Sequence, residues 1–214
     1  ANNHDWQTTT PEIVRQLEAT GLFEVDVTND PGSLSAAEIR RYDVLVNNYY
    51  GPEWSEPTRQ AALDYLADGG GMVVIHAADN AFPGWVEFES LIGVAWRGGA
   101  GHGTYHRYMV TIDDPQHPIL KGVPHFLHAP DELYHNLTWG EGSKAVVIAS
   151  AYSRPEESGT GRVEPMLLVN HWGKGRMFHT VMGHDVPTLQ GFYHTLILQR
   201  GAETKVKNLP KKTQ

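Results

Sequence analysis

The chain contains no cysteine, so disulfides, thiolate metal sites and a cysteine nucleophile are all excluded. It has no apolar run near the roughly 20 residues that a membrane-spanning helix needs, and no signal peptide is recognisable. It also lacks an excess of positive charge, because the formal net charge is −8. Nucleic acid and an anionic membrane surface are therefore not expected as partners.

The rest of the composition is that of a globular protein with one core. Hydrophobic residues make up 40% and charged residues 20% of the 214 residues, which are ample for a single core. Since no repeat or linker divides the sequence, we expect one domain over residues 1–204 and a polar, basic tail over residues 205–214. The 12 histidines and 6 tryptophans are unusually many and direct attention to a site built from side chains.

One stretch, Gly69–Asp79 (GGGMVVIHAAD), organises the chain. Its four apolar residues Met72–Ile75 show no alternation, which is typical of a strand covered on both faces. His76 follows at once. Because ligands gather beyond the carboxyl ends of strands in an open parallel sheet, His76 is the first candidate for a site residue. A buried histidine bonded to one carbonyl is the alternative.

Helices and strands are expected to alternate in the first half. The patterns predict helices from Pro11 to about Gly21, over Leu34–Arg41 and over Pro57–Asp68, and strands over Phe23–Val27 and Val44–Val46. This order predicts an α/β fold with a mostly parallel sheet and helices on both faces. Such a sheet needs a strand before the first helix, where only polar residues stand. Either that strand is absent from this chain, or the sheet is built without it, or a partner protomer supplies it in a homo-oligomer.

The second half is richer in strands. We expect strands over Tyr105–Ile112, Ala145–Ala149, Pro165–Trp172 and Met177–Met182, and helices over Phe82–Leu91 and Phe192–Arg200. The Gly173–Arg176 segment (GKGR) is expected to be a hairpin turn rather than a phosphate-binding loop, because no helix follows it.

Four motifs, in order, carry a resemblance to a known family: GGGMVVIHAA, DDPQHPILKGVP, DELYH and GKGRMFHTVMGHD. Together they resemble the ThuA-like family, which is similar in fold to class I glutamine amidotransferases. The resemblance implies a flavodoxin-like domain without a nucleotide cofactor. It also implies that His76 stands where the amidotransferases carry their nucleophilic cysteine, and that His184 and Asp185 lie near their late histidine. Without cysteine, glutamine hydrolysis through a thioester is excluded.

The same resemblance implies a role in carbohydrate catabolism, on glycosides that a partner dehydrogenase has oxidised at carbon 3. A ketone at C3 acidifies the proton at C2, so a base can form an enolate and the glycosidic oxygen can leave by elimination. Hydrolysis and isomerisation would use the same groups. A sugar-binding or interaction module without catalysis is the alternative. An unrelated ester or amide hydrolase ranks last, because no GxSxG motif is present.

Histidines and acidic residues provide the candidate chemistry, since such a reaction needs a base, an acid and positive charge near the enolate. If Asp131–His135 forms a helical turn, Glu132 and His135 share one face at metal-ligand spacing. The catalytic candidates are His76, His106, Glu132 and His184; the candidate ligands for a divalent metal (Zn, Mn, Ni or Mg) are His76, His106, Glu132 and His135.

Further residues are candidates for binding the substrate. His4 and Trp6 stand where a first strand would end, His102 lies between glycines, and aromatic rings can stack on a sugar. The substrate-binding candidates are His4, Trp6, Tyr49, Tyr50, His102, Asp131 and Asp185. The remaining histidines are expected to be structural. The sequence leaves the compartment open between cytoplasm and periplasm.

Overall fold

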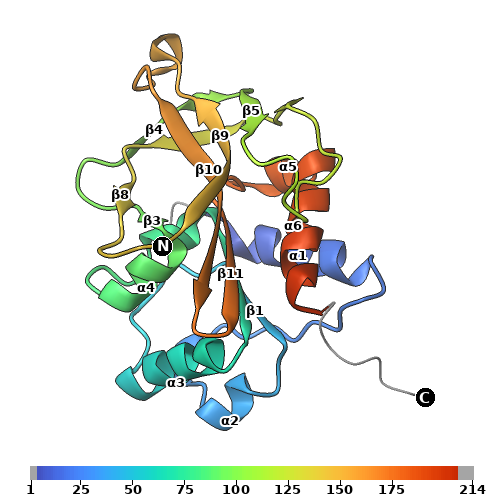
Figure 1. Ribbon diagram of the computed structural model, residues 1–214, viewed down its shortest axis with the longest axis vertical. Helices are drawn as coiled ribbons and strands as arrows, with labels where there is room; N and C mark the ends of the chain where they lie inside the picture. The colour runs from blue at the N-terminus through green and yellow to red at the C-terminus, as the bar shows by residue number, and fades with distance from the viewer. Residues whose placement is uncertain (1–3, 207–214) are drawn as a thin grey trace.

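The structure, a computed structural model, describes residues 4–206 and contains a curled sheet of seven strands (Figure 1). In spatial order the strands are β1 (Val44–Asn47), β2 (Gly71–Ile75), β11 (Gly175–Thr180), β10 (Val163–Trp172), β9 (Val146–Tyr152), β5 (Met109–Ile112) and β6 (Phe126–Leu127). The fold is therefore mixed α/β, in agreement with the expected class.

The prediction of a mostly parallel sheet is wrong. Only β1–β2 and β2–β11 are parallel pairs, whereas β11–β10, β10–β9, β9–β5 and β5–β6 are antiparallel. The connections explain the difference. A parallel pair needs a crossover of a dozen or more residues, but only Gly173 and Lys174 separate β10 from β11. The expected hairpin turn at this point is confirmed.

Helices cover both faces of the parallel part, as predicted. In Figure 1, α1, α5 and α6 lie to the right of the sheet and α3 and α4 to its left. The β2 side chains alternate between the two layers: Val73 and Ile75 pack with α1 and α6, and Met72 and Val74 pack with α3 and α4. The α-helices are α1 (Trp6–Glu18), α2 (Ala36–Ile39), α3 (Glu56–Ala67), α4 (Val86–Ile92), α5 (Val186–Leu189) and α6 (Phe192–Val206), and the 3₁₀ helices are Pro31–Ser33, His76–Asn80 and Pro155–Glu157.

Two small antiparallel sheets complete the fold, β3 (Val94–Ala95) with β8 (Thr138–Trp139) and β4 (Gly101–His106) with β7 (Asp131–His135). The single strand predicted over Tyr105–Ile112 is wrong, because the chain leaves β4 after His106 and resumes as β5 in the main sheet. Tyr108 lies in this break and turns into the core, where it is 3% exposed.

The predicted helical turn at Asp131–His135 is also wrong, since this segment is strand β7. Side chains three residues apart on a strand point to opposite faces, so Glu132 and His135 cannot coordinate the same metal ion. The same period of two instead places Glu132 and Tyr134 on one face.

The predicted strand over Phe23–Val27 does not form, because this extended segment pairs with no strand among the described residues. No strand precedes α1 within residues 4–206 either, so β1 is the last strand at this edge of the sheet. A mainly apolar cavity of about 460 Å³ lies between the segment and β1, lined among others by Phe23, Val25 and Val44. The sheet in the described part of the chain is thus built without the expected first strand.

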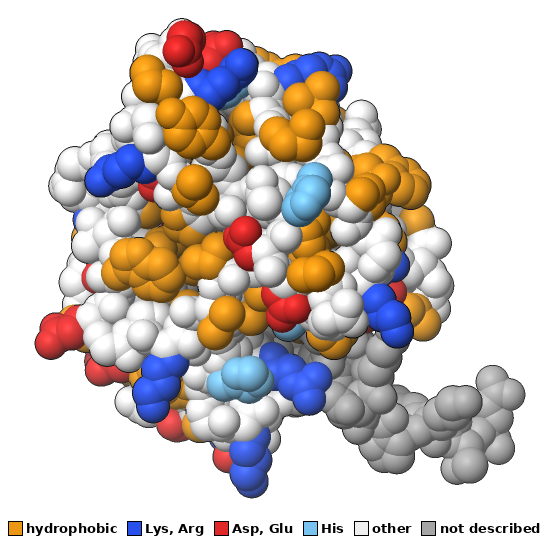
Figure 2. Space-filling view, turned by 45° about the horizontal axis from the view of Figure 1, so that its top comes forward, with side chains coloured by type: hydrophobic (Ala, Val, Ile, Leu, Met, Phe, Trp, Pro, Cys, Tyr) orange, Lys and Arg blue, Asp and Glu red, His pale blue; other side chains and the backbone are white. Residues whose placement is uncertain are grey.

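Figure 2 shows one face of the molecule, on which Lys and Arg side chains are separated from one another and lie mostly toward the periphery. Hydrophobic side chains gather on the same face in several separate patches. Within residues 4–206, no helix is both long enough and apolar enough to cross a bilayer.

Candidate active site

His76 lies directly after β2, as predicted, and begins the 3₁₀ helix His76–Asn80. Its φ of 44° lies in the left-handed region, which is costly for a residue with a side chain and recurs at functional sites. The ring is 1% exposed, and its Nδ1 lies 2.7 Å from the Val181 carbonyl oxygen. Because a carbonyl oxygen only accepts, Nδ1 donates the proton and Nε2 is left with a free lone pair.

His184 lies beyond β11, the strand that pairs in parallel with β2. Parallel neighbours end at the same edge of a sheet, and the His76 and His184 rings are accordingly 5.6 Å apart. Gly183, with a φ of 127°, turns the chain just before His184. The two histidines that the sequence places after separate buried strands are therefore neighbours in space.

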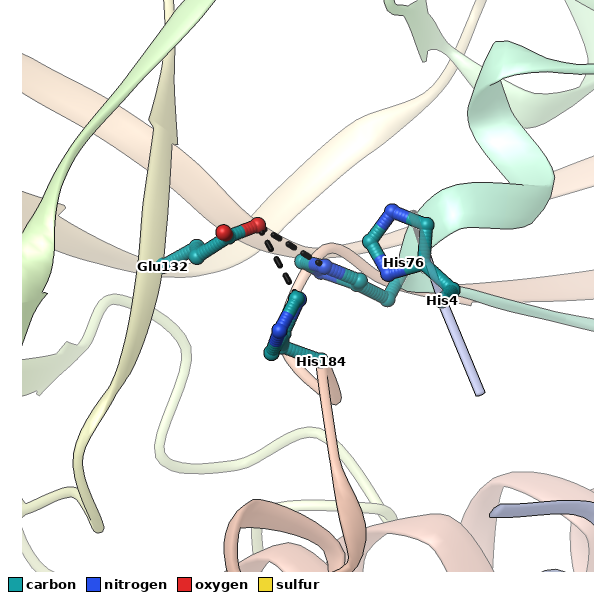
Figure 3. Close-up of side chains that lie close together, drawn as sticks. All are labelled: His4, His76, Glu132 and His184. Carbon is teal, nitrogen blue, oxygen red and sulfur yellow. Dashed lines mark ion pairs between the residues drawn. The ribbon is translucent and has the colours of Figure 1, made fainter. Parts of the chain in front are cut away.

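Glu132 comes from β7 and brings the carboxylate to these histidines. Its Oε2 lies 3.1 Å from His184 Nδ1 and 3.7 Å from His76 Nε2, both within ion-pair range (Figure 3). Its other oxygen, Oε1, lies 3.7 Å from His102 Nε2. The parallel part of the fold thus supplies two imidazoles, and the antiparallel β4–β7 sheet supplies the acid between them.

His4 completes the group from the start of the described chain. Its ring centroid lies 4.9 Å from that of His76 and 5.0 Å from that of His184, and its Nε2 lies 3.3 Å from the Tyr134 hydroxyl. Helix α1 begins at Trp6, earlier than the predicted Pro11, and this early start holds His4 against the sheet edge. Figure 3 shows the side chains of His4, His76, Glu132 and His184 converging from four separate segments. We call these four residues the open cluster.

The donor atoms of the open cluster fit a metal ion. One ligand atom from each residue lies within 4.8 Å of all the others. His4 Nδ1, His76 Nε2 and His184 Nδ1 are buried and have no hydrogen-bond partner, so His184 and Glu132 are close without being aligned for a hydrogen bond. Ligands about 2.0–2.1 Å from a tetrahedral zinc ion lie roughly 3.3 Å apart, which is close to the Glu132 distances.

Opposed pKa shifts separate the members of the cluster. Burial favours the neutral form of Glu132, but contacts with His184 and His76 outweigh it and hold the pKa of Glu132 well below its usual range. The same carboxylate raises the pKa of His184 against the effect of burial. Burial, assisted by His76 and His184, lowers the pKa of His4 to about 4. At neutral pH Glu132 is therefore ionised and His4 is neutral.

A small cavity opens onto the cluster and is lined by the three histidines together with Trp6, Thr9, Asn48, Tyr50, Ala77 and Gly183. Its free volume of about 20 Å³ is enough for one water molecule or one ion. Trp6 and Tyr50 are 41% and 37% exposed and stand at its rim. The larger cavity beside β1 contains none of the three histidines, so its size does not mark it as the site of chemistry.

The other predicted site residues lie in varied surroundings. His102, 44% exposed at the side chain, faces Glu132. Asp185 accepts a hydrogen bond from Tyr105 and caps α5, and Tyr49 packs against Trp54 and Phe82.

Three more of these residues lie outside the open cluster. His106 donates from Nδ1 to the Thr104 carbonyl oxygen at 2.6 Å, and His135 pairs with Gly101. Asp131 is 0% exposed and lies beneath the cluster.

Sequence reasoning missed Tyr134, which is 2% exposed and packs on His76 with ring centroids 4.1 Å apart. It stands inside the DELYH motif, and reading this motif as a strand would have placed it on the same face as Glu132. Sequence reasoning also missed a second pair below His76, in which Asp79 Oδ2 lies 3.9 Å from His179 Nε2. No local pattern marks this pair, because its members lie on separate elements.

Comparisons with known proteins agree with the four motifs. A family model described as ThuA, trehalose utilisation, matches residues 1–203. The chain is 32% identical to a ThuA-like protein of Parabacteroides merdae ATCC 43184, with a TM-score of 0.85, over 100% of this chain and 89% of that one. It is 20% identical to a ThuA-like protein of Bacteroides uniformis ATCC 8492, with a TM-score of 0.68, over 94% and 86% of the two chains.

A more distant likeness shows the fold alone. At 17% identity and a TM-score of 0.55, 94% of this chain resembles 27% of a β-galactosidase from Rahnella sp. R3. No curated protein matches the sequence.

Proposed function

This chain belongs to the ThuA family, and we propose that it is an enzyme of carbohydrate catabolism that acts on an oxidised, 3-keto sugar or glycoside. The observation that carries the proposal is the open cluster: three imidazoles and one ionised carboxylate converge, and three of their buried nitrogens have no hydrogen-bond partner. His184 Nδ1 faces the Glu132 carboxylate at 3.1 Å, but a merely structural cluster would leave His4 Nδ1 and His76 Nε2 uncompensated, which is costly in a protein interior.

We propose that the open cluster binds one divalent metal ion. Imidazole nitrogen suits Zn²⁺ and Ni²⁺, and a mixed set with one carboxylate also accommodates Mn²⁺. Mg²⁺ is the poorest match among the expected ions, because it prefers oxygen ligands and water. When bound, such an ion would polarise a substrate carbonyl group and stabilise the negative charge of an enolate.

We assign the proton transfer to His102, whose ring faces Glu132. Its Nδ1 donates to the Gly103 carbonyl oxygen at 2.7 Å, so Nε2 is the atom free to accept a proton. It can take the proton from C2 while the electron pair of the C–H bond forms the enolate, and imidazole is the commonest general base. The C1–O bond then breaks by elimination, and protonated His102 returns the proton to the departing oxygen. The Glu132 carboxylate lies 3.7 Å from this Nε2. His106, outside the cluster, has no role in this scheme.

The rim of the cavity favours an uncharged substrate. Among the described residues that line the cavity there is no Lys or Arg, the side chains that usually bind phosphate or carboxylate groups. Trp6 and Tyr50 instead offer aromatic faces, and Asn48 and Thr9 offer polar groups. This combination suits a neutral sugar ring with hydroxyl groups. A dehydrogenase that oxidises carbon 3 would have to produce the 3-keto substrate.

The test combines metal analysis with turnover. Purified protein, stripped and reloaded with Zn²⁺, Ni²⁺ or Mn²⁺ in turn, is incubated with 3-keto-trehalose, and the products are identified by NMR. We expect one ion per chain and turnover that Glu132→Gln lowers by about 10²–10⁴-fold. His171→Gln serves as the control, because His171 pairs with Arg176 at the end of β11 that lies away from the open cluster. Absence of both metal binding and turnover would refute the proposal, and sugar binding without turnover would favour the non-catalytic module.

A further inference from the structure

The buried carboxylate of Asp131 lies directly beneath the open cluster. Asp131, at the start of β7, is 0% exposed and does not line the cavity. Its Oδ1 accepts hydrogen bonds from the backbone N–H groups of Glu132 at 2.8 Å and His184 at 3.3 Å. Its Oδ2 accepts from the Gly183 N–H at 3.0 Å. One oxygen therefore holds the backbone of two members of the open cluster that are far apart in sequence.

We propose that Asp131 is the positioning residue of the site, fixing the backbones of Glu132 and His184 so that their side chains meet. The inference rests on the proposed function, because it assigns the supporting group of the same cluster. Glu132 belongs to β7 and His184 to the loop after β11, and β7 and β11 belong to different sheets. Asp131 provides hydrogen bonds that join these two segments directly beneath the Glu132–His184 contact.

Two side chains behind Asp131 hold its carboxylate in place. His128 Nε2 lies 3.1 Å from Oδ2, and the Tyr108 hydroxyl donates to the same oxygen at 3.5 Å. His128 is 1% exposed, and its ring stacks 5.8 Å from that of His194. A buried carboxylate is tolerated only when its oxygens are satisfied, and here five donors surround it. Its orientation is therefore fixed from both sides.

If Asp131 only anchored β7 to the core, its replacement would leave the open cluster unchanged. If it positions Glu132 and His184, its replacement should alter metal binding by the cluster. In Asp131→Asn the amide has one acceptor oxygen, so it cannot accept from both the Glu132–His184 side and Gly183. Loss of a group that orients metal ligands typically weakens metal affinity by about 10–100-fold. The matched control is Glu164→Gln, since Glu164 is also buried, 6% exposed, and accepts from Asn136 and Thr160.

The experiment measures the Zn²⁺ affinity of the full chain by competition with a chelator, and the visible spectrum of the Co²⁺-loaded protein. We expect Asp131→Asn to bind Zn²⁺ about 10–100-fold more weakly and to change the Co²⁺ spectrum, and Glu164→Gln to do neither. Wild-type affinity and an unchanged spectrum in folded Asp131→Asn would overturn the proposal.

A second pair of variants covers the case in which Asp131→Asn does not fold. His128→Leu removes one donor from behind Asp131, and His128→Gln restores one through its amide. We expect weaker Zn²⁺ binding in the first and recovery in the second. Lower thermal stability of His128→Leu with unchanged Zn²⁺ affinity would show a structural role only.

The metal-free protein separates this inference from the proposed function. If the wild-type protein binds no Zn²⁺, Ni²⁺ or Mn²⁺, the metal part of the proposed function fails. The ¹⁵N NMR signal of His184 Nδ1 still reports whether the ring meets Glu132. A change of this signal in Asp131→Asn, but not in Glu164→Gln, supports the positioning role. An unchanged signal refutes it.

Discussion

Two groups of histidine and carboxylate lie close to the 3₁₀ helix His76–Asn80, and they differ in nearly every physical respect. The open cluster gathers Glu132 with three imidazoles around a small cavity. The second group, which we call the closed pair, consists of Asp79 and His179, both 0% exposed and 3.9 Å apart. Both groups combine histidine with a carboxylate but differ in surroundings, and the surroundings decide what each can do.

The pKa values of the carboxylates in the two groups are shifted in opposite directions. Contacts with His184 and His76 keep Glu132 ionised. Burial instead raises the pKa of Asp79 well above its usual range, and Arg97 opposes this only in part. Burial also lowers the pKa of His179 to about 4. Burial therefore favours the neutral form of both members of the closed pair. His179 Nδ1 donates to the Ile92 carbonyl oxygen, and its Nε2 faces Asp79.

The largest expected effect is that of Glu132→Gln in the open cluster. The amide keeps the size of the side chain but removes the negative charge that raises the pKa of His184 and that a metal would need. We expect kcat to fall by about 10²–10⁴-fold, the usual range for losing an acid–base or charge-stabilising group. Steady-state kinetics on a 3-keto glycoside measure this. Activity of Glu132→Gln near that of the wild type would show that the open cluster is no more important for catalysis than the closed pair.

The second effect concerns stability at acid pH. Burial lowers the pKa of His194 to about 4, as it does for His179. Below the unfolded pKa of about 6.5 the unfolded chain binds a proton that the folded chain refuses, so stability falls as the pH drops toward 4. For His194 the loss is about 2 kcal/mol at pH 5 relative to pH 7.

Urea unfolding of the wild type and of His194→Gln at both pH values measures this loss. His194→Gln leaves the Asp79–His179 pair in place. Its free energy of unfolding should fall less than that of the wild type between pH 7 and pH 5. Equal drops in the two proteins would mean that His194 does not titrate as a buried histidine.

The comparison also shows how much could be predicted from the sequence. The β2 strand with His76 and the histidine after β11 were found because each is a local pattern with a known place in an open sheet. The pairing of β4 with β7 could not be found in this way, since it joins segments about 30 residues apart and no short motif encodes it. Reading Asp131–His135 as a helical turn consequently linked Glu132 with His135.

The antiparallel half of the sheet was missed for a related reason. Apolar runs indicate a buried strand but not its direction. The hairpin turn at Gly173–Arg176 was expected, but its consequence, an antiparallel β10–β11 pair, was not carried into the predicted sheet. The connection after β9 was not weighed against the length that a parallel crossover needs. The meeting of His4 with His76 depends on the docking of α1 and was available only as a hypothesis. The catalytic and substrate-binding roles of these residues stay predictions.

A smaller effect is expected at the rim of the open cluster. Trp6→Ala removes an exposed aromatic face beside the cavity, and aromatic contacts of this kind contribute about 0.5–1.5 kcal/mol. We therefore expect KM for a 3-keto glycoside to rise by about 2–10-fold with kcat nearly unchanged. Trp139→Ala is the control, because Trp139 on β8 is 50% exposed and does not line the cavity. A similar rise in both variants would exclude stacking on Trp6.

The smallest effect on catalysis is expected for Asp79→Asn in the closed pair. Burial favours the protonated form of Asp79, which the amide matches in charge and shape, and Asp79 is not part of the open cluster, so kcat should stay close to the wild-type value. Stability should nevertheless change with a definite sign. Because the pKa of Asp79 is raised on folding, the folded chain takes up a proton that the unfolded chain releases above its usual pKa, and this opposes folding increasingly as the pH rises. Asp79→Asn removes this cost, so its stability relative to the wild type should increase from pH 4 to pH 7.

Urea unfolding at several pH values measures the difference. A loss of stability that grows toward pH 7, or a fall in kcat comparable to that of Glu132→Gln, would show that Asp79 is ionised and belongs functionally with the open cluster.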